Sequence, residues 1–381
     1  MPGHKPLILF VPGFKGSYLR RSPAGRRIWI TLQEALLGSC SLGLPVPGTD
    51  TGCVELQPDG VIEQLRMAKG LWQQDHYGSW LDRLRQHFGS SVDLVPFGYD
   101  WRQGVQGSCA QLEQVVDRHD PTSTRPLAVL GHSYGGLIAS VLMVRLAGSA
   151  KTRRKQAVLV TAGTPFLGVP SMFRSLDLGM VTGRNRRLLA ARVLASFPAS
   201  YQLLPPSDHP YLYLRDGTLF ADPLGDAATW LEHQWGLFNT SGSRDSHALL
   251  AHLQHMLDSA SGVYALLQTP QHAVQVPPVV LNIYGRGQPT PARVYLGENG
   301  AGQLRQIKSR DALKDPEIAL PQLLYAPGDG TVPAESAQLP VALQAWGQGM
   351  ETTAVHAALL QQEHIQGEVL ALLDRTLFAA G

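Results

Sequence analysis

The sequence has few cysteines, little net charge and no long apolar run, and each of these features argues against a class of protein. Three cysteines in 381 residues are too few for a disulfide scaffold or a cysteine-based zinc site. No run of about 20 apolar residues is present, so no membrane span is predicted. The net charge of +2 gives no overall basic field and argues against nucleic acid as a partner. Two short basic patches, 151–155 and 184–187, are interpreted as solvated loop charges or as contacts to anionic lipid head groups.

Glycine and proline are abundant, with 39 and 27 residues, and they separate short apolar runs from one another. Seven of these runs are predicted to be strands, and helical segments lie between most of them. Such alternation is typical of a parallel sheet covered by helices on both faces, so we predict an α/β fold. The predicted strands are residues 6–11, 91–97, 126–130, 157–163, 278–284, 321–327 and 350–356.

Two segments do not follow this alternation. Residues 20–75 contain a proline- and glycine-rich stretch, and residues 166–275 contain several aromatic residues and an amphipathic helical pattern. Long insertions between core strands commonly cover a functional site. We therefore expect a single domain over residues 1–381, with a lid-like insertion at about 20–75 and a cap insertion at about 166–275.

The first residues do not resemble a secretory signal. Their apolar run is short and reaches Pro12 without a small-residue cleavage site, so it is predicted to be the first strand. A cytoplasmic protein, peripheral to a membrane at most, is therefore expected. Reduced thiols are the default in that compartment, whereas Cys40 and Cys53 could close one small loop in an oxidising one.

The stretch Gly131-His132-Ser133-Tyr134-Gly135 follows an apolar strand and precedes an apolar helix. The pattern G-x-S-x-G in this context is typical of a sharp turn that exposes a nucleophilic serine. Glycines two residues before and after the serine let the backbone segments pass closely, which a Cβ atom would prevent. Ser133 is thus the predicted nucleophile. The alternative is a serine that only caps the following helix.

Two backbone N–H groups are expected to stabilise the oxyanion that forms when the serine attacks an ester. The helix after Ser133 begins with free N–H groups at its positive dipole end, and the Tyr134 N–H is the expected first donor. The segment "VPGFKGS" (11–17) follows the first predicted strand and contains a Pro-Gly turn. The Phe14 N–H is the expected second donor, and the alternative is a plain connecting turn.

In such sites an acid and then a histidine follow the serine in chain order. The loop "YAPGDGTVP" (325–333) follows a late predicted strand, and Asp329 lies between two glycines there. Two histidines follow. His356 comes directly after the last predicted strand, whereas His364 would lie two turns into a helix. We predict Asp329 as the acid and His356 as the base, with a simple turn aspartate as the alternative for Asp329.

The sequence resembles the lecithin:cholesterol acyltransferase family, which includes lysosomal phospholipase A2 and phospholipid:diacylglycerol acyltransferases. The resemblance implies an α/β-hydrolase fold with a mostly parallel central sheet flanked by helices. It also implies Ser133, Asp329 and His356 as the triad, and the Phe14 and Tyr134 amides as the oxyanion hole. The similar segments are, in chain order, "VPGFKGSYL", "YDWR", "GHSYGG", "GTPFLGVP", "IYGRGQPTPARVYL", "GDGTVP" and "VHAALLQQEHI".

These features predict a serine-dependent lipid acyltransferase or acyl-ester hydrolase, of the phospholipase A or O-acyltransferase type, that forms an acyl-enzyme on Ser133. The expected partner is a lipid or ester substrate at a membrane surface, and no cofactor, metal or nucleic acid is expected. The alternatives are an esterase that acts on soluble small esters and a catalytically silent hydrolase-fold binding protein. The intact serine, aspartate and histidine argue against the silent protein.

Overall fold

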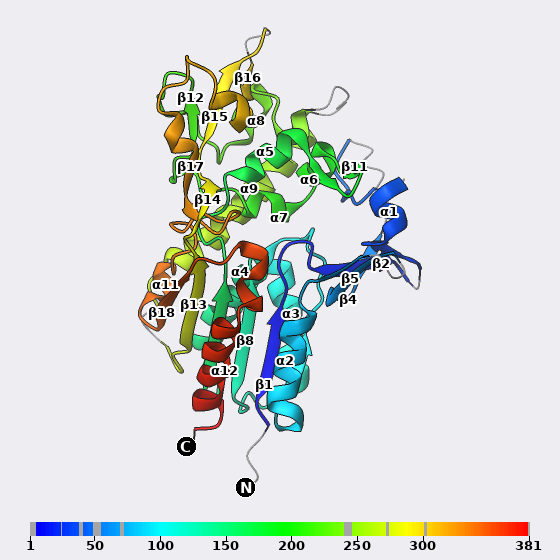
Figure 1. The fold of residues 1–381 in the computed structure, drawn as a ribbon, viewed down its shortest axis with the longest axis vertical. Coiled ribbons are helices and arrows are strands. Elements are labelled where there is room, and N and C mark those ends of the chain that lie inside the picture. Colours follow the sequence, from blue (N-terminus) through cyan, green and yellow to red (C-terminus); the bar gives the residue numbers. More distant parts are fainter. Residues whose placement is uncertain are drawn as a thin grey trace.

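The computed structural model describes residues 5–23, 25–37, 41–48, 55–68, 72–239, 246–271, 274–300 and 303–379. The chain forms a lower body around the central sheet and an upper body above the carboxyl ends of its strands (Figure 1). Cys40 and Cys53 lie outside the described residues, and Cys109 is a buried free thiol. Among the helices of the described ranges, none combines the length and the apolar character needed to cross a membrane.

The centre of the lower body is a six-stranded parallel sheet with the strand order β18-β13-β9-β8-β1-β7. Six of the seven predicted strands are found in it. The runs of β1, β8 and β9 are buried along their whole length, as expected of parallel strands covered on both faces. The strands are β1 (Leu7–Val11), β7 (Asp93–Pro96), β8 (Leu127–His132), β9 (Ala157–Ala162), β13 (Val279–Gly285) and β18 (Gly347–Thr352).

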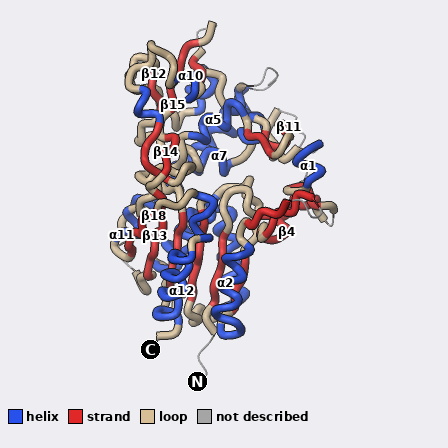
Figure 2. The backbone as a smooth tube through the Cα atoms, viewed as in Figure 1, coloured by secondary structure: helices blue, strands red, loops and turns tan. Residues whose placement is uncertain are grey.

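Helices cover both faces of this sheet, and the alternation of β1 side chains defines the two sides. Leu7, Leu9 and Val11 face α3 (Val105–His119) and α4 (Tyr134–Ala147) in one hydrophobic core. Ile8 and Phe10 face α2 (Gly78–Phe88) and α12 (Glu363–Leu377) in the other. Figure 2 shows both of these helices in front of the strands. The predicted α/β-hydrolase fold, a mostly parallel sheet flanked by helices, is confirmed.

Helix α4 is buried all round, with twelve of its fourteen residues inaccessible to solvent. It lies between the sheet on one side and α9 (Ser246–Gln268) of the upper body on the other. A helix without a polar face needs apolar partners on every side. The upper body therefore completes the hydrophobic core that begins at the sheet, and the two share one continuous cluster of buried side chains.

The remaining predicted strand, residues 321–327, is a strand only in its second half and does not belong to the central sheet, so this prediction was wrong in part. Its first half forms the 3₁₀ helix η3 (Pro321–Leu324), and its second half begins β17 (Tyr325–Gly328). Strand β17 pairs in antiparallel fashion with β14 (Gln288–Pro291), outside the sheet. A run with prolines at positions 321 and 327 cannot provide the ladder donors of a central strand.

The segment between β1 and α2 forms a small layer beside the lower body (Figure 1). A three-stranded sheet with the order β3-β2-β4 and the hairpin β5-β6 make up most of it. Short 3₁₀ turns and helices elsewhere in the lower body are η1 (Gly89–Ser91), α11 (Val341–Gln344) and η4 (His356–Gln361). The elements of the small layer are β2 (Ser17–Arg21), β3 (Arg27–Trp29), α1 (Leu32–Leu37), β4 (Leu56–Val61), β5 (Gln64–Ala68) and β6 (Trp72–Asp75).

The upper body is built from two stretches of chain, one on each side of β13. The two stretches join where β12 pairs with β15. The first contributes α5 (Ser171–Leu178), β10 (Met180–Thr182), β11 (Asn185–Leu189), α6 (Ala191–Ala195), α7 (Pro198–Gln202), β12 (Leu212–Leu214), α8 (Ala227–Glu232), η2 (Gly236–Phe238) and α9. The second contributes β14, β15 (Val294–Glu298), β16 (Leu304–Gln306), α10 (Ser309–Ala312), η3 and β17.

Aromatic residues of the first stretch form the interior of the upper body. Trp230 and Trp235 are buried and lie edge to face, with ring centroids 6.1 Å apart. Phe173 packs against both, at 5.9 and 4.9 Å. These rings stabilise the body that carries them and are not available to a membrane surface.

Candidate active site

Ser133 lies in the turn between β8 and α4, at the carboxyl edge of the sheet. Its backbone is left-handed, with φ at 55° and ψ at −126°, and its N–H donates to Ala162 O at 2.8 Å. A non-glycine residue in this region is strained, and such strain is commonly found at functional sites. The hydroxyl makes no capping bond to α4, so the simple capping alternative has no support.

The glycines around Ser133 are required by close backbone contacts. A Cβ on Gly135 would lie 2.3 Å from the carbonyl oxygens of Val11 and Pro12. A Cβ on Gly131 would lie 2.6 Å from Gly136 Cα. Both contacts are with backbone, which cannot move away as a flexible side chain can. The sequence pattern therefore reflects a turn pressed against the end of β1.

The two expected oxyanion donors border the same turn. A Cβ on Gly13 would come within 2.9 Å of Ser133 Cβ, which places the loop after β1 directly against the serine. Within the described residues, neither the Phe14 N–H nor the Tyr134 N–H has an intramolecular acceptor. The Phe14 ring is held edge-on by Trp101, with centroids 5.1 Å apart. Their role toward an oxyanion stays a prediction.

Asp329 and His356 form a close pair. Asp329 Oδ2 lies 2.7 Å from His356 Nδ1, and Asp329 Oδ1 accepts from the N–H groups of Thr331 at 2.9 Å and Val332 at 2.7 Å. The carboxylate is 2% exposed. A Cβ on Gly285 would lie 2.6 Å from Asp329 Cβ. Asp329 directly follows β17 in the chain, but its side chain packs against the end of β13. With Nδ1–H donating to Asp329, the other ring nitrogen, Nε2, keeps its lone pair.

The end of β9 brings Ser133 and His356 together. Ser133 donates to Ala162, and a Cβ on the next residue, Gly163, would lie 2.8 Å from His356 Nδ1. Within the described residues, no hydrogen bond joins the Ser133 hydroxyl to the His356 ring; such contacts commonly shorten only when substrate binds. His364 is exposed on α12 and lies outside this cluster.

Sequence reasoning missed two neighbours of the site, Tyr77 and His132. The Gly13 N–H donates to Tyr77 Oη at 3.0 Å, and Tyr77 Oη lies 2.9 Å from His132 Nδ1. His132 Nε2 lies 3.1 Å from His356 O, and the two histidine rings are 4.8 Å apart. Burial, and then the charge of His356, hold the pKa of His132 well below 6.5. His132 stands inside the recognised motif, but no local pattern indicates Tyr77.

Tyr134 links the nucleophile turn to the upper body. Its phenol donates to Gln202 Oε1 at 2.7 Å and lies 3.2 Å from Gln103 O. Gln202 in turn donates to Gln106 Oε1 at 2.7 Å and to Ser259 Oγ at 3.2 Å. Burial raises the pKa of the Tyr134 phenol, which keeps it a neutral donor. Helices α3, α4, α7 and α9 thus meet at one buried amide.

Known proteins share both the sequence pattern and the fold. The family model for lecithin:cholesterol acyltransferase matches residues 61–375, which is most of the chain. The chain belongs to the lecithin:cholesterol acyltransferase family.

Two further similarities, one in sequence and one in structure, are more distant. The chain is 22% identical over 313 residues to the uncharacterized protein YJR098C of Saccharomyces cerevisiae, and the match covers 76% of this chain but 43% of the yeast protein. A chain in the crystal structure of the Tle4–Tli4 complex superposes with a TM-score of 0.61 at 14% identity, covering 99% of both chains. At that identity the superposition shows the shared fold alone.

Proposed function

We propose that the protein is a serine-dependent lipid acyltransferase or acyl-ester hydrolase of the phospholipase A or O-acyltransferase type. The observation that carries the proposal is the Asp329–His356 pair of 2.7 Å beside the strained turn of Ser133. A serine hydroxyl attacks an ester only when a base removes its proton. An imidazole whose Nδ1–H is held by a buried carboxylate has its Nε2 lone pair free for that task.

In the first half of the reaction, Ser133 Oγ attacks the ester carbonyl carbon while His356 Nε2 takes the hydroxyl proton. The carbonyl oxygen becomes an oxyanion, which the Phe14 and Tyr134 N–H groups stabilise. Asp329 stabilises the imidazolium. The tetrahedral intermediate then collapses, the alcohol leaving group takes the proton from His356 Nε2, and the acyl group remains on Ser133.

In the second half, water or a lipid hydroxyl gives its proton to His356 Nε2 and attacks the acyl-enzyme. The same donors stabilise the second oxyanion, and Ser133 leaves with the proton. Which acceptor reacts depends on how well the site excludes water. We propose that residues 20–75 act as a lid and residues 166–275 as a cap for this purpose.

We also propose that the protein meets its substrate at a membrane surface, through a patch formed by α1 and the β10–β11 hairpin. These elements are joined by bonds from Asn185 Nδ2 to Glu34 O at 2.7 Å and from the Arg184 N–H to Ala35 O at 3.2 Å. The patch exposes large apolar side chains beside the basic run 184–187, a combination suited to an anionic lipid surface. The exposed side chains are Leu36 of α1 at 40% and Val181 of β10 at 60%, together with Leu178 at 51%, which ends α5 two residues before β10.

The catalytic proposal is tested with a fluorophosphonate probe and with labelled phospholipid vesicles. We expect the probe to modify Ser133, and the Ser133→Ala variant to lose both labelling and turnover. Vesicles that contain a sterol or diacylglycerol separate the two acceptors, because a hydrolase releases only free fatty acid whereas a transferase forms a new ester. Turnover confined to short soluble esters would instead favour a small-ester esterase. Failure of the probe to label detergent-treated protein would favour a silent binding protein.

The membrane proposal has its own test, in which Val181→Asp is compared with Leu320→Asp. Leu320 is 50% exposed but lies in the second stretch of the upper body, outside the patch. We expect Val181→Asp to weaken co-sedimentation with phosphatidylglycerol-containing vesicles and to leave turnover of a soluble ester unchanged. Equal binding by the two variants would contradict the assignment of this surface.

A further inference from the structure

A single chain of hydrogen bonds connects three loops at the candidate site. It begins at the Gly13 N–H in the loop after β1, passes through Tyr77 Oη to His132 Nδ1, and continues from His132 Nε2 to the carbonyl oxygen of His356. The three donor–acceptor distances are 3.0, 2.9 and 3.1 Å. Gly13 precedes the expected oxyanion donor Phe14, and His356 is the expected base.

The direction of this chain is fixed by its two ends. The Gly13 N–H can only donate, and the His356 carbonyl oxygen can only accept. His132 must therefore carry its proton on Nε2, which leaves Nδ1 as an acceptor for the Tyr77 hydroxyl. The Tyr77 oxygen in turn accepts from Gly13. In this arrangement, and only in this one, every buried group of the chain has its partner.

The surroundings favour the same neutral form of His132. Both Tyr77 and His132 are buried, with exposed fractions of 5% and 7%. The titratable groups around His132 are the neutral Tyr77 phenol and the rings of His356 and His76. The ring centroids of His132 and His356 are 4.8 Å apart, and those of His76 and Tyr77 are 4.4 Å apart. Asp329 lies beyond His356 and pairs with it. A proton on His132 would add a positive charge beside the imidazolium that His356 must form.

We propose that Tyr77 and His132 are positioning residues, which hold the oxyanion loop and the base loop against the nucleophile turn through this one-directional chain. The inference rests on the proposed function. It assigns Tyr77, a residue 55 positions from His132, to the machinery of the site. Neither residue touches the reacting atoms. Each acts by fixing where Phe14 and His356 lie relative to Ser133.

The main test is Tyr77→Phe, which keeps the ring and its packing on Phe10 at 5.0 Å but removes the hydroxyl. Gly13 N–H and His132 Nδ1 then lose their partners. We expect kcat for a soluble ester to fall by about 10- to 100-fold with little change in KM, because misplacement acts on the transition state. We also expect the variant to lose activity at a higher pH than the wild type as the pH is lowered. The reason is that His132 no longer receives the bond that keeps it neutral, so its pKa rises.

The matched control is Tyr295→Phe. The Tyr295 phenol is also buried and has two backbone acceptors in range of its one proton, Ala319 O at 2.7 Å and Leu320 O at 2.9 Å, but it lies on β15 of the upper body. Loss of this hydroxyl should change stability while leaving kcat and the pH profile as in the wild type. If Tyr77→Phe gives the same kcat and pH profile as Tyr295→Phe, the positioning chain is refuted.

Two substitutions of His132 each keep one of its two hydrogen bonds, and they test the proposal if Tyr77→Phe does not fold. His132→Asn keeps an acceptor near Nδ1 for Tyr77, and His132→Gln keeps a donor near Nε2 for His356. We expect both to be slower than the wild type and faster than His132→Leu, which keeps neither bond. Equal rates for all three would overturn the proposal.

Nitrogen NMR of histidine-labelled wild-type protein gives a readout independent of activity. We expect the His132 signals, assigned by their absence in His132→Asn, to show protonated Nε2 and unprotonated Nδ1 at pH 7. The opposite tautomer would overturn the proposal. The proposed function has a separate test. It fails if the fluorophosphonate probe does not label the wild-type protein and if the Ser133→Ala variant keeps wild-type turnover.

Discussion

Asp329→Asn is the sharpest test of the acid–base pair, because the structure fixes how the new amide must lie. Asp329 Oδ1 accepts from two backbone N–H groups, those of Thr331 and Val332. An asparagine must keep its carbonyl oxygen there, so its NH₂ group would face His356 Nδ1. That nitrogen would then have to accept, which moves the ring proton to Nε2. An Nε2–H cannot take the proton of Ser133.

The size of the effect follows from the cost of flipping the amide. The flipped form restores the correct tautomer but places the NH₂ group against two buried donors. Each lost hydrogen bond to a buried donor costs about 1–3 kcal/mol, so the flipped form lies about 2–6 kcal/mol higher. With about 1.4 kcal/mol for each factor of ten, kcat should fall by about 30- to 10⁴-fold. The assay is ester turnover together with the rate of fluorophosphonate labelling.

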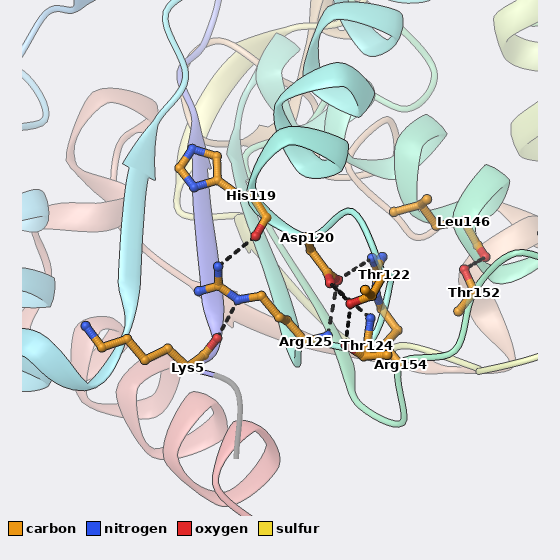
Figure 3. Close-up of polar contacts among 9 residues, drawn as sticks. All are labelled: Lys5, His119, Asp120, Thr122, Thr124, Arg125, Leu146, Thr152 and Arg154. Atoms are coloured by element: carbon orange, nitrogen blue, oxygen red, sulfur yellow. Dashed lines mark hydrogen bonds and ion pairs between the residues drawn. The ribbon is translucent and has the colours of Figure 1, made fainter. Parts of the chain in front are cut away.

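Asp120→Asn provides the matched control. Asp120 is also 2% exposed and accepts from the N–H groups of Thr124 at 3.0 Å and Arg125 at 3.1 Å, and it pairs with buried Arg154 at 3.0 Å (Figure 3). Removing its charge leaves Arg154 unpaired and should lower the free energy of unfolding by about 3–5 kcal/mol without a comparable loss of kcat. A folded Asp329→Asn protein that keeps more than about a third of wild-type kcat would refute the tautomer argument.

Three further predictions concern residues next to the site. Gly163→Ala, at φ +58° and with its Cβ 2.8 Å from His356 Nδ1, should displace the imidazole and lower kcat about 100-fold; an unchanged kcat would contradict this packing. Burial lowers the pKa of Lys15 from 10.5, so between the lowered pKa and 10.5 the unfolded chain binds more protons at this residue, and the contribution of Lys15 to stability rises with pH. Lys15→Met should therefore resist urea better than the wild type at pH 7, and this advantage should shrink toward pH 10; a constant difference would exclude the linkage. The buried Thr164 hydroxyl has no partner among the described residues, so Thr164→Val should raise the free energy of unfolding by about 1 kcal/mol in calorimetry, and a loss of stability would indicate an unseen partner.

Local patterns in the sequence predict most of the central sheet. Continuous apolar runs such as those of β1, β8 and β9 are typical of strands buried on both faces, and these are the strands that the structure confirms. The run at 321–327 is equally apolar, but its prolines cannot supply ladder donors, and it pairs outside the sheet. Apolar composition alone does not distinguish the two cases, and proline argues only against a strand with partners on both sides, since the edge strand β7 ends at Pro96.

The candidate site divides in the same way between local and long-range information. Ser133 is predicted from a five-residue motif, and its glycines are needed because a Cβ at either position would clash with nearby backbone. Asp329 and His356 are indicated by their order in the chain, and the structure places them 2.7 Å apart. Tyr77 could not be predicted, because its contacts with Gly13 and His132 span 64 and 55 residues and follow no local pattern. Such contacts arise only when the sheet assembles.

The pairing of β12 with β15 has a consequence for how this protein can be re-engineered or can diverge. The upper body is a composite of two stretches that β13 separates, and β17, which precedes Asp329, emerges from the second stretch. Exchange of residues 166–275 alone with a relative would break a parallel strand pair and remove half of that composite. A chimaera with transplanted specificity must therefore carry both stretches at once. The carboxylate of Asp329 would then travel with the donor protein, whereas the nucleophile would remain with the recipient.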